Sequence, residues 1–161
     1  MRAGDLMASV TITVDSAQVR KMLEIAPERV RTRLKRVLNV VAVETQREMR
    51  IKAQVGVSGD LRQSIKQEVT GTTAIVGPTA KYAEAVENGS RPHWTSVKPD
   101  TSLYKWAKAK GISPYAVQRS IAYKGTKAHP FVAPTVTLME PRIQRRFDTE
   151  IEKLTEELMN G

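Results

Sequence analysis

One stretch of the chain constrains its fold more than any other, a run from Pro27 to about Gln54 in which apolar residues recur every three or four positions. This spacing places them on one face of an α-helix. Proline is well tolerated in the first turn of a helix, so Pro27 is expected to open it. The helix would be about 40 Å long, with a buried face formed by Val30, Leu34, Val37, Leu38, Val41, Thr45, Met49 and Ala53.

The other faces of this helix are strongly basic. Eight Arg and Lys residues stand against Glu28, Glu44 and Glu48, so the helix carries +5 of the chain's formal net charge of +9. Such a surface attracts nucleic acid or acidic partners through long-range electrostatics, although a solvated helix face has the same composition. The candidates for an interface or a DNA channel are Arg29, Arg31, Arg33, Lys35, Arg36, Arg47 and Arg50.

The remaining segments alternate between short strands and helices. Residues 10–14 alternate apolar residues with Thr, as in a half-buried strand, and residues 69–77 resemble a hairpin that ends at Pro78. Residues 61–67 suit either a helical turn or the start of a strand. Helices are expected over residues 16–25, 82–87, 103–110 (with Trp106 on the apolar side), 114–123 and 135–159.

The last of these helices is expected to be kinked or restarted at Pro141. Its apolar face consists of Ile143, Phe147, Ile151, Leu154 and Leu158, and its acidic last turns carry Glu150, Glu152, Glu156 and Glu157. The pattern predicts an α+β fold in which the long basic amphipathic helix and the C-terminal helix pack on a small antiparallel sheet. At 161 residues the chain suits one domain, 1–161.

Catalytic and cofactor-binding patterns are missing from the sequence. It has no Cys and only two histidines, His93 and His129, and it lacks the spacings of a metal site or a phosphate-binding loop. We therefore expect no cofactor, no metal and no enzymatic activity; a small ribonuclease that uses the two histidines is an alternative.

No apolar run is long enough to span a membrane. Residues 1–9 do not form a signal peptide, and Met7 is an alternative start.

Three short segments in a fixed order carry a recognisable pattern. The first is Ser58-Gly59-Asp60-Leu61-Arg62-Gln63-Ser64-Ile65, which follows the long helix. The second is Val76-Gly77-Pro78 with Tyr82-Ala83, Val86-Glu87 and Gly89-Ser90-Arg91-Pro92-His93. The third is Ala128-His129-Pro130-Phe131-Val132-Ala133-Pro134, which leads into the last helix.

Together the three segments resemble the phage neck or tail-component family, the gene-product-10-like head–tail joining and tail-completion proteins of long-tailed bacteriophages. The resemblance covers roughly residues 20–155. The segment 94–127 departs from the shortest members and resembles a two-helix insertion found in longer ones. The resemblance implies a structural virion protein of a phage or prophage, a ring subunit that is most often hexameric and is assembled in the host cytoplasm. The implied partners are head-completion, connector and tail proteins, with non-specific contact to DNA in the channel and no membrane.

The motif residues also have direct physical interpretations. Gly59 permits a tight turn before Leu61, and Tyr82 with Val86 would share one face of a helix and pack in the core. Glu87 could pair with Arg91 within the subunit or across a ring interface. The other motif residues expected to be structural are Gly89, Pro130 and Phe131, of which Phe131 is either a core plug or an interface anchor.

Two other functions remain open at this point. The protein could be a tail-terminator ring that stops tube growth, which keeps the phage assignment and changes the position. It could also be a basic DNA-binding protein without sequence specificity, of another class altogether. In a ring, the basic helix and the acidic C-terminal helix would suit head-to-tail pairing of subunits.

Overall fold

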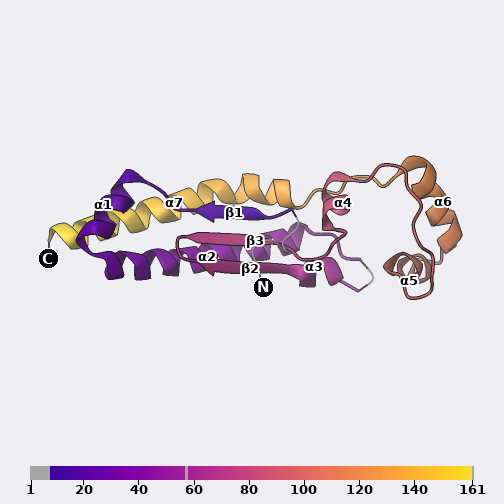
Figure 1. Cartoon of the computed structure of the whole chain (residues 1–161), viewed down its shortest axis with the longest axis horizontal. Coiled ribbons are helices and arrows are strands. Elements are labelled where there is room, and N and C mark those ends of the chain that lie inside the picture. The colour runs from indigo at the N-terminus through magenta and orange to yellow at the C-terminus, as the bar shows by residue number, and fades with distance from the viewer. Residues whose placement is uncertain (1–7, 57, 161) are drawn as a thin grey trace.

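The computed structural model describes residues 8–56 and 58–160, and these form an elongated molecule with seven helices and three strands (Figure 1). The alternative start at Met7 lies outside the described residues. The elements are β1 (Val10–Thr13), α1 (Ala17–Ile25), α2 (Pro27–Lys52), α3 (Asp60–Ser64), β2 (Ile65–Thr70), β3 (Thr73–Pro78), α4 (Ala83–Asn88), α5 (Ser102–Ala109), α6 (Pro114–Lys124) and α7 (Val132–Met159). The predicted α+β class is confirmed.

The sheet is antiparallel in the order β1-β3-β2. Val10 lies opposite Val76 in one pair, and Ile65 lies opposite Pro78 in the other. The predicted hairpin is confirmed, and its first strand begins at Ile65. Residues 61–67 were expected to form either a helical turn or the start of a strand. Each prediction is correct for a part of this segment, because α3 ends at Ser64 and β2 follows directly.

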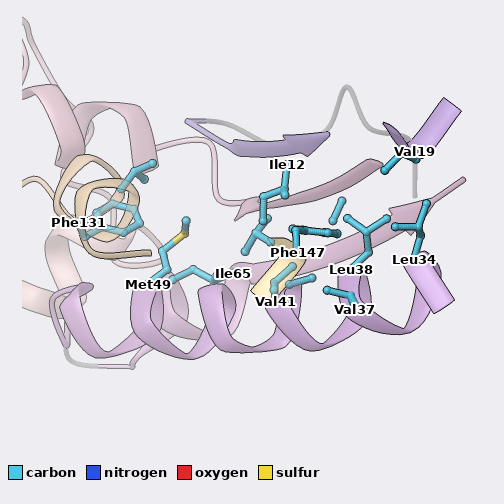
Figure 2. Close-up of a cluster of buried hydrophobic side chains, with 14 of the residues drawn as sticks. Ile12, Val19, Leu34, Val37, Leu38, Val41, Met49, Ile65, Phe131 and Phe147 are labelled. Atoms are coloured by element: carbon cyan, nitrogen blue, oxygen red, sulfur yellow. The ribbon is translucent and has the colours of Figure 1, made fainter. Parts of the chain in front are cut away.

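Helix α2 supplies the largest part of the core. Its eight predicted stripe residues are all buried, and Val30, Leu38 and Val41 are fully inaccessible. The helix contacts α1, β2, β3 and α7, so its apolar face meets the sheet and the C-terminal helix together (Figure 2). The side chains of Ile12, Ile65 and Phe147 complete this core from the other elements.

Helix α7 begins at Val132, three residues before the predicted start, and it runs through Pro141 without interruption. The prediction of a restart at Pro141 was therefore wrong. The earlier start has a long-range cause: the carboxylate of Glu87, on α4, binds backbone N–H groups at the beginning of the helix. Nothing near Val132 in the sequence signals such a cap.

Helices α5 and α6, which belong to the segment expected to be an insertion, lie at one end of the long axis, while α1 and the end of α7 lie at the other end (Figure 1). The chain enters and leaves the insertion at one place, where Ser90 and Thr126 exchange two backbone hydrogen bonds of 3.1 Å each. The flanking Gly89 and Gly125 have φ angles of 74° and 72°. A Cβ at these positions would lie 2.6 Å from the Thr126 carbonyl oxygen and 1.9 Å from that of Ser90, so the approach requires glycine.

The small insertion buries few of its large side chains. Trp106, predicted on the apolar side of its helix, is 37% exposed, whereas the neighbouring Ala107 is fully buried. Helix α5 packs mainly on α6, and two short helices offer little apolar area to cover an indole, so the Trp106 ring is only partly buried.

Leu38 provides a test of the packing of α2. Leu38→Ala should lower the free energy of unfolding by about 2–5 kcal/mol, because the removed methyl groups leave a cavity in a closely packed core. Val43→Ala is the matched control, since Val43 is on the same helix and 51% exposed. Urea denaturation measures both; equal losses for the two variants would contradict this packing.

Candidate functional site

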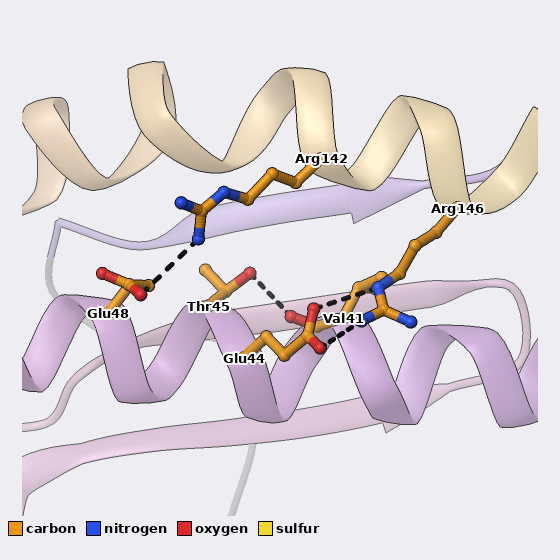
Figure 3. Close-up of polar contacts among 6 residues, drawn as sticks. All are labelled: Val41, Glu44, Thr45, Glu48, Arg142 and Arg146. Carbon is orange, nitrogen blue, oxygen red and sulfur yellow. Dashed lines mark hydrogen bonds and ion pairs between the residues drawn. The ribbon is translucent and has the colours of Figure 1, made fainter.

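Helices α2 and α7 lie side by side and are joined by ion pairs across their outer edges (Figure 3). Arg146 binds Glu44 through two nitrogens, and Arg142 lies 3.6 Å from Glu48. Both partners recur after four residues, so each helix presents its two side chains on one face. The pairs are half-exposed and each contributes little stability, but together they align the two helices.

Arg33 connects the same two helices at a second place, near the C-terminal end of α7. Its guanidinium lies 2.6 Å from Glu157 and 3.6 Å from Glu150. The side chain of Arg33 is 27% exposed, which makes this pairing the least solvated of those around α2. Two of the four predicted acidic residues of α7 are thus used inside the subunit, which removes them from the head-to-tail pairing expected from the sequence.

An open groove of about 740 Å³ runs between the two helices. Its floor includes Val37 and Val40, and its walls are lined by Arg33, Arg36, Glu44, Arg47, Glu48, Arg142, Arg145, Arg146, Thr149, Glu150 and Lys153. Seven of these lining side chains are basic and three are acidic. Arg36 and Arg47 are exposed and form no ion pair within residues 8–56 and 58–160. The groove therefore has a positive potential that remains available to a partner.

The seven predicted basic candidates divide into two groups. Arg33 and Arg50 are half-buried and engaged within the subunit; Arg50 donates to the carbonyl oxygen of Ile65 at 2.9 Å. The five that remain at the surface are Arg29, Arg31, Lys35, Arg36 and Arg47, of which Arg31 pairs with Glu28 at 3.2 Å. The other four, and not Arg33 or Arg50, form no ion pair within the described residues and are free to contact other molecules.

The motif residue Glu87 is the principal buried charge of the described region, at 9% exposure. Its carboxylate accepts hydrogen bonds from the backbone N–H groups of Phe131, Val132 and Ala133 at 2.7, 2.9 and 2.9 Å. The next residue, Pro134, has no N–H to satisfy. Glu87 thus binds the free donors of the first turn of α7, where a negative charge also interacts well with the helix dipole.

This arrangement resolves the expected role of Glu87. No ion pair joins it to Arg91 in the described part of the chain; its partners are backbone groups of α7. The adjacent carbonyl oxygen of Val86 accepts from the N–H of His129 at 2.7 Å. The second and third sequence segments therefore meet in space at the start of α7.

The other motif residues are structural in different ways. Gly59 has φ 70° and precedes α3, as its expected turn requires, and Leu61 is buried. Phe131 is fully buried, as expected of a core plug, whereas Pro130 is exposed.

Tyr82 corrects one expectation: it is 43% exposed and does not belong to the core. It precedes α4 instead of lying on its packed face, which is formed by Ala83 and Glu87. Partial burial and the nearby Asp60 carboxylate raise the pKa of Tyr82 above its usual value.

The two histidines lie on the surface and have mainly backbone contacts. Nδ1 of His93 is 2.8 Å from the carbonyl oxygen of Arg91, and His129 contributes its backbone N–H to Val86. Within residues 8–56 and 58–160 no group of three or more potential ligands is placed to hold a metal ion. Over the same residues no helix is long and apolar enough to cross a membrane.

Some residues of this surface were missed by sequence reasoning. In the predictions from the sequence, Glu44 and Glu48 were only charges that reduce the net positive charge of their helix. Arg142 and Arg146 had no predicted role. The equal four-residue spacing of the two pairs was a usable signal, but it required knowing that the helices lie side by side.

Comparison with known families finds one match within the chain. Residues 17–89 match the model of a family described as Bacteriophage HK97-gp10, putative tail-component. Over these residues the chain is similar to the HK97-gp10-like tail components. The resemblance predicted from the sequence is confirmed for this segment, which runs from α1 to the glycine where the insertion begins. No curated protein and no solved structure matches.

The HK97-gp10-like segment contains Glu87 but not the helix that it caps. Glu87→Gln should lower the free energy of unfolding by about 1.5–3 kcal/mol, because the amide places an NH₂ group or a neutral oxygen against three N–H donors. Glu84→Gln, an exposed change on the same helix, serves as the control. Thermal unfolding followed by circular dichroism measures both, and a loss shared by the control would refute the capping role.

Proposed function

We propose that the protein is a structural, non-enzymatic subunit of a ring at the head–tail junction of a tailed phage or prophage virion. There it completes the tail or joins it to the head. The whole chain, 1–161, would form one tail-component domain that contains the insertion at 94–127. The HK97-gp10-like segment supports the phage assignment. The observation that carries the proposed role is a set of exposed, unpaired basic side chains on one face of α2 in that segment, Arg29, Arg36 and Arg47, of which the last two line the α2–α7 groove.

The arrangement of charge suits a surface that meets another component of the virion axis. Arg36 and Arg47 line the groove beside the exposed apolar Val40, so a partner can combine ion pairs with apolar contact. The negative charge that these basic side chains require can come from a neighbouring subunit, from a connector or tail protein, or from DNA in the channel. The proposed ring is a hexamer of identical subunits in the virion, assembled in the host cytoplasm.

The charge-reversal variant Arg29→Glu/Arg36→Glu/Arg47→Glu, called the groove variant below, tests the proposal, and it leaves the internal pair of Arg33 intact. In a phage that depends on this gene, we expect unjoined heads and tails under the electron microscope and a fall in infectious titre of at least about tenfold. The control is Lys21→Glu/Lys66→Glu/Lys81→Glu, which changes three exposed charges away from the groove. Normal joining by the groove variant would exclude the proposed role of these charges.

The same variants separate the two alternatives. A tail terminator predicts tails of irregular length instead of unjoined tails of normal length. A DNA-binding protein predicts that the wild type binds free duplex with a steep salt dependence and forms no ring. The slope of log K against log salt should then decrease by about 3 in the groove variant.

A further inference from the structure

The outer face of α6 carries an exposed aromatic and basic surface. Tyr115, Arg119 and Tyr123 recur every four residues and so share one face of the helix. They border a shallow hollow together with Trp94 and Lys124. The exposed fractions of Trp94, Tyr115 and Tyr123 are 73%, 68% and 71%, so these rings are almost uncovered. We call these five residues the tip patch.

Two properties distinguish the tip patch from an ordinary solvated surface. Trp, Tyr and Arg are the residue types that contribute most to binding at protein interfaces. The insertion also concentrates charge: residues 94–127 contain seven basic side chains and one acidic side chain, Asp100. None of the seven forms an ion pair with another described residue. The tip patch is thus suited to an acidic partner surface with an apolar component.

The same chain carries such a surface on α7. Asp148, Glu152 and Glu156 are exposed and recur every four residues, so they share one face of the helix, and Met159 follows with 79% exposure. Glu152 and Glu156 form no ion pair with any described residue, in contrast to Glu150 and Glu157. We call Asp148, Glu152, Glu156 and Met159 the acidic edge.

The two surfaces cannot meet within one molecule. The insertion and the C-terminal end of α7 lie at opposite ends of the long axis (Figure 1). Contact between them therefore requires a second copy of the chain. The lengths match: residues 115–124 and 148–159 extend about 14 and 17 Å along their helices.

We propose that the tip patch of one subunit binds the acidic edge of the next. Arg119 and Lys124 face the carboxylates of Glu152 and Glu156, and the thioether of Met159 packs on the exposed rings. The interface is heterologous, so its repetition connects copies head to tail and closes into a ring when the rotation permits. This inference rests on the proposed ring function and names the contact that would build the ring.

Cross-linking tests the contact directly, since the natural chain has no Cys. Tyr123→Cys and Glu156→Cys are prepared as separate proteins, mixed, and treated with a short thiol-specific bifunctional reagent. We expect a cross-linked dimer that contains one copy of each variant. The control replaces Glu156→Cys with Lys66→Cys on β2. A yield no higher than in this control overturns the inference.

A charge swap provides a second measurement. Arg119→Glu/Lys124→Glu and Glu152→Lys/Glu156→Lys should each weaken self-association by at least about tenfold, as followed by size-exclusion chromatography with light scattering. The chain that carries all four substitutions should associate again, because the charges are again complementary. Failure of this rescue, or loss of duplex DNA binding without any change in self-association, overturns the inference.

The outcomes separate this interface from the proposed function. If the swapped variants assemble like the wild type and their virions join normally, the interface is wrong while the junction role stands. If cross-links and rescue occur but virions that lack the protein join heads and tails normally, the junction role is wrong while the interface stands.

Discussion

Packing of the apolar face of α2 against the sheet on one side and α7 on the other holds the body of the molecule together. Val30, Leu38 and Val41 are inaccessible because both neighbours close over the same stripe. Once that face is buried, the Arg and Lys side chains of α2 lie on the other faces of the helix. Arg33 then meets carboxylates of α7, and Arg36 and Arg47 border the groove. The charge pattern of the proposed functional surface is thus a consequence of core packing.

A second constraint couples the body to the insertion. Within a few residues of chain, Val86 and Glu87 bind the segment that starts α7, and Ser90 pairs with Thr126. These contacts connect parts of the chain more than thirty residues apart. They explain why the motif residues of the second and third segments occur together: Glu87 is useful only where Phe131 to Ala133 present their N–H groups to it.

Features with a local cause were predictable from the sequence. The stripe of α2, the hairpin around Gly71 and the short helix α1 follow from periodicity and turn chemistry, and the structure agrees. Features that depend on distant partners were not predictable. The start of α7 depends on Glu87, and the engagement of Arg33 depends on which acidic residues of α7 lie opposite. The exposure of Tyr82 and Trp106 depends on how much surface their neighbours cover.

The paired residues Ser90 and Thr126 also make the insertion a separable module. Its two ends are adjacent, so a shorter or different segment between them would need only to span one hydrogen-bonded pair and would leave the backbone of the body in place. An exchange of this segment would therefore change the molecule at one place on its surface. Under the interface proposed above, such an exchange would alter which subunits assemble with one another and leave the core unchanged.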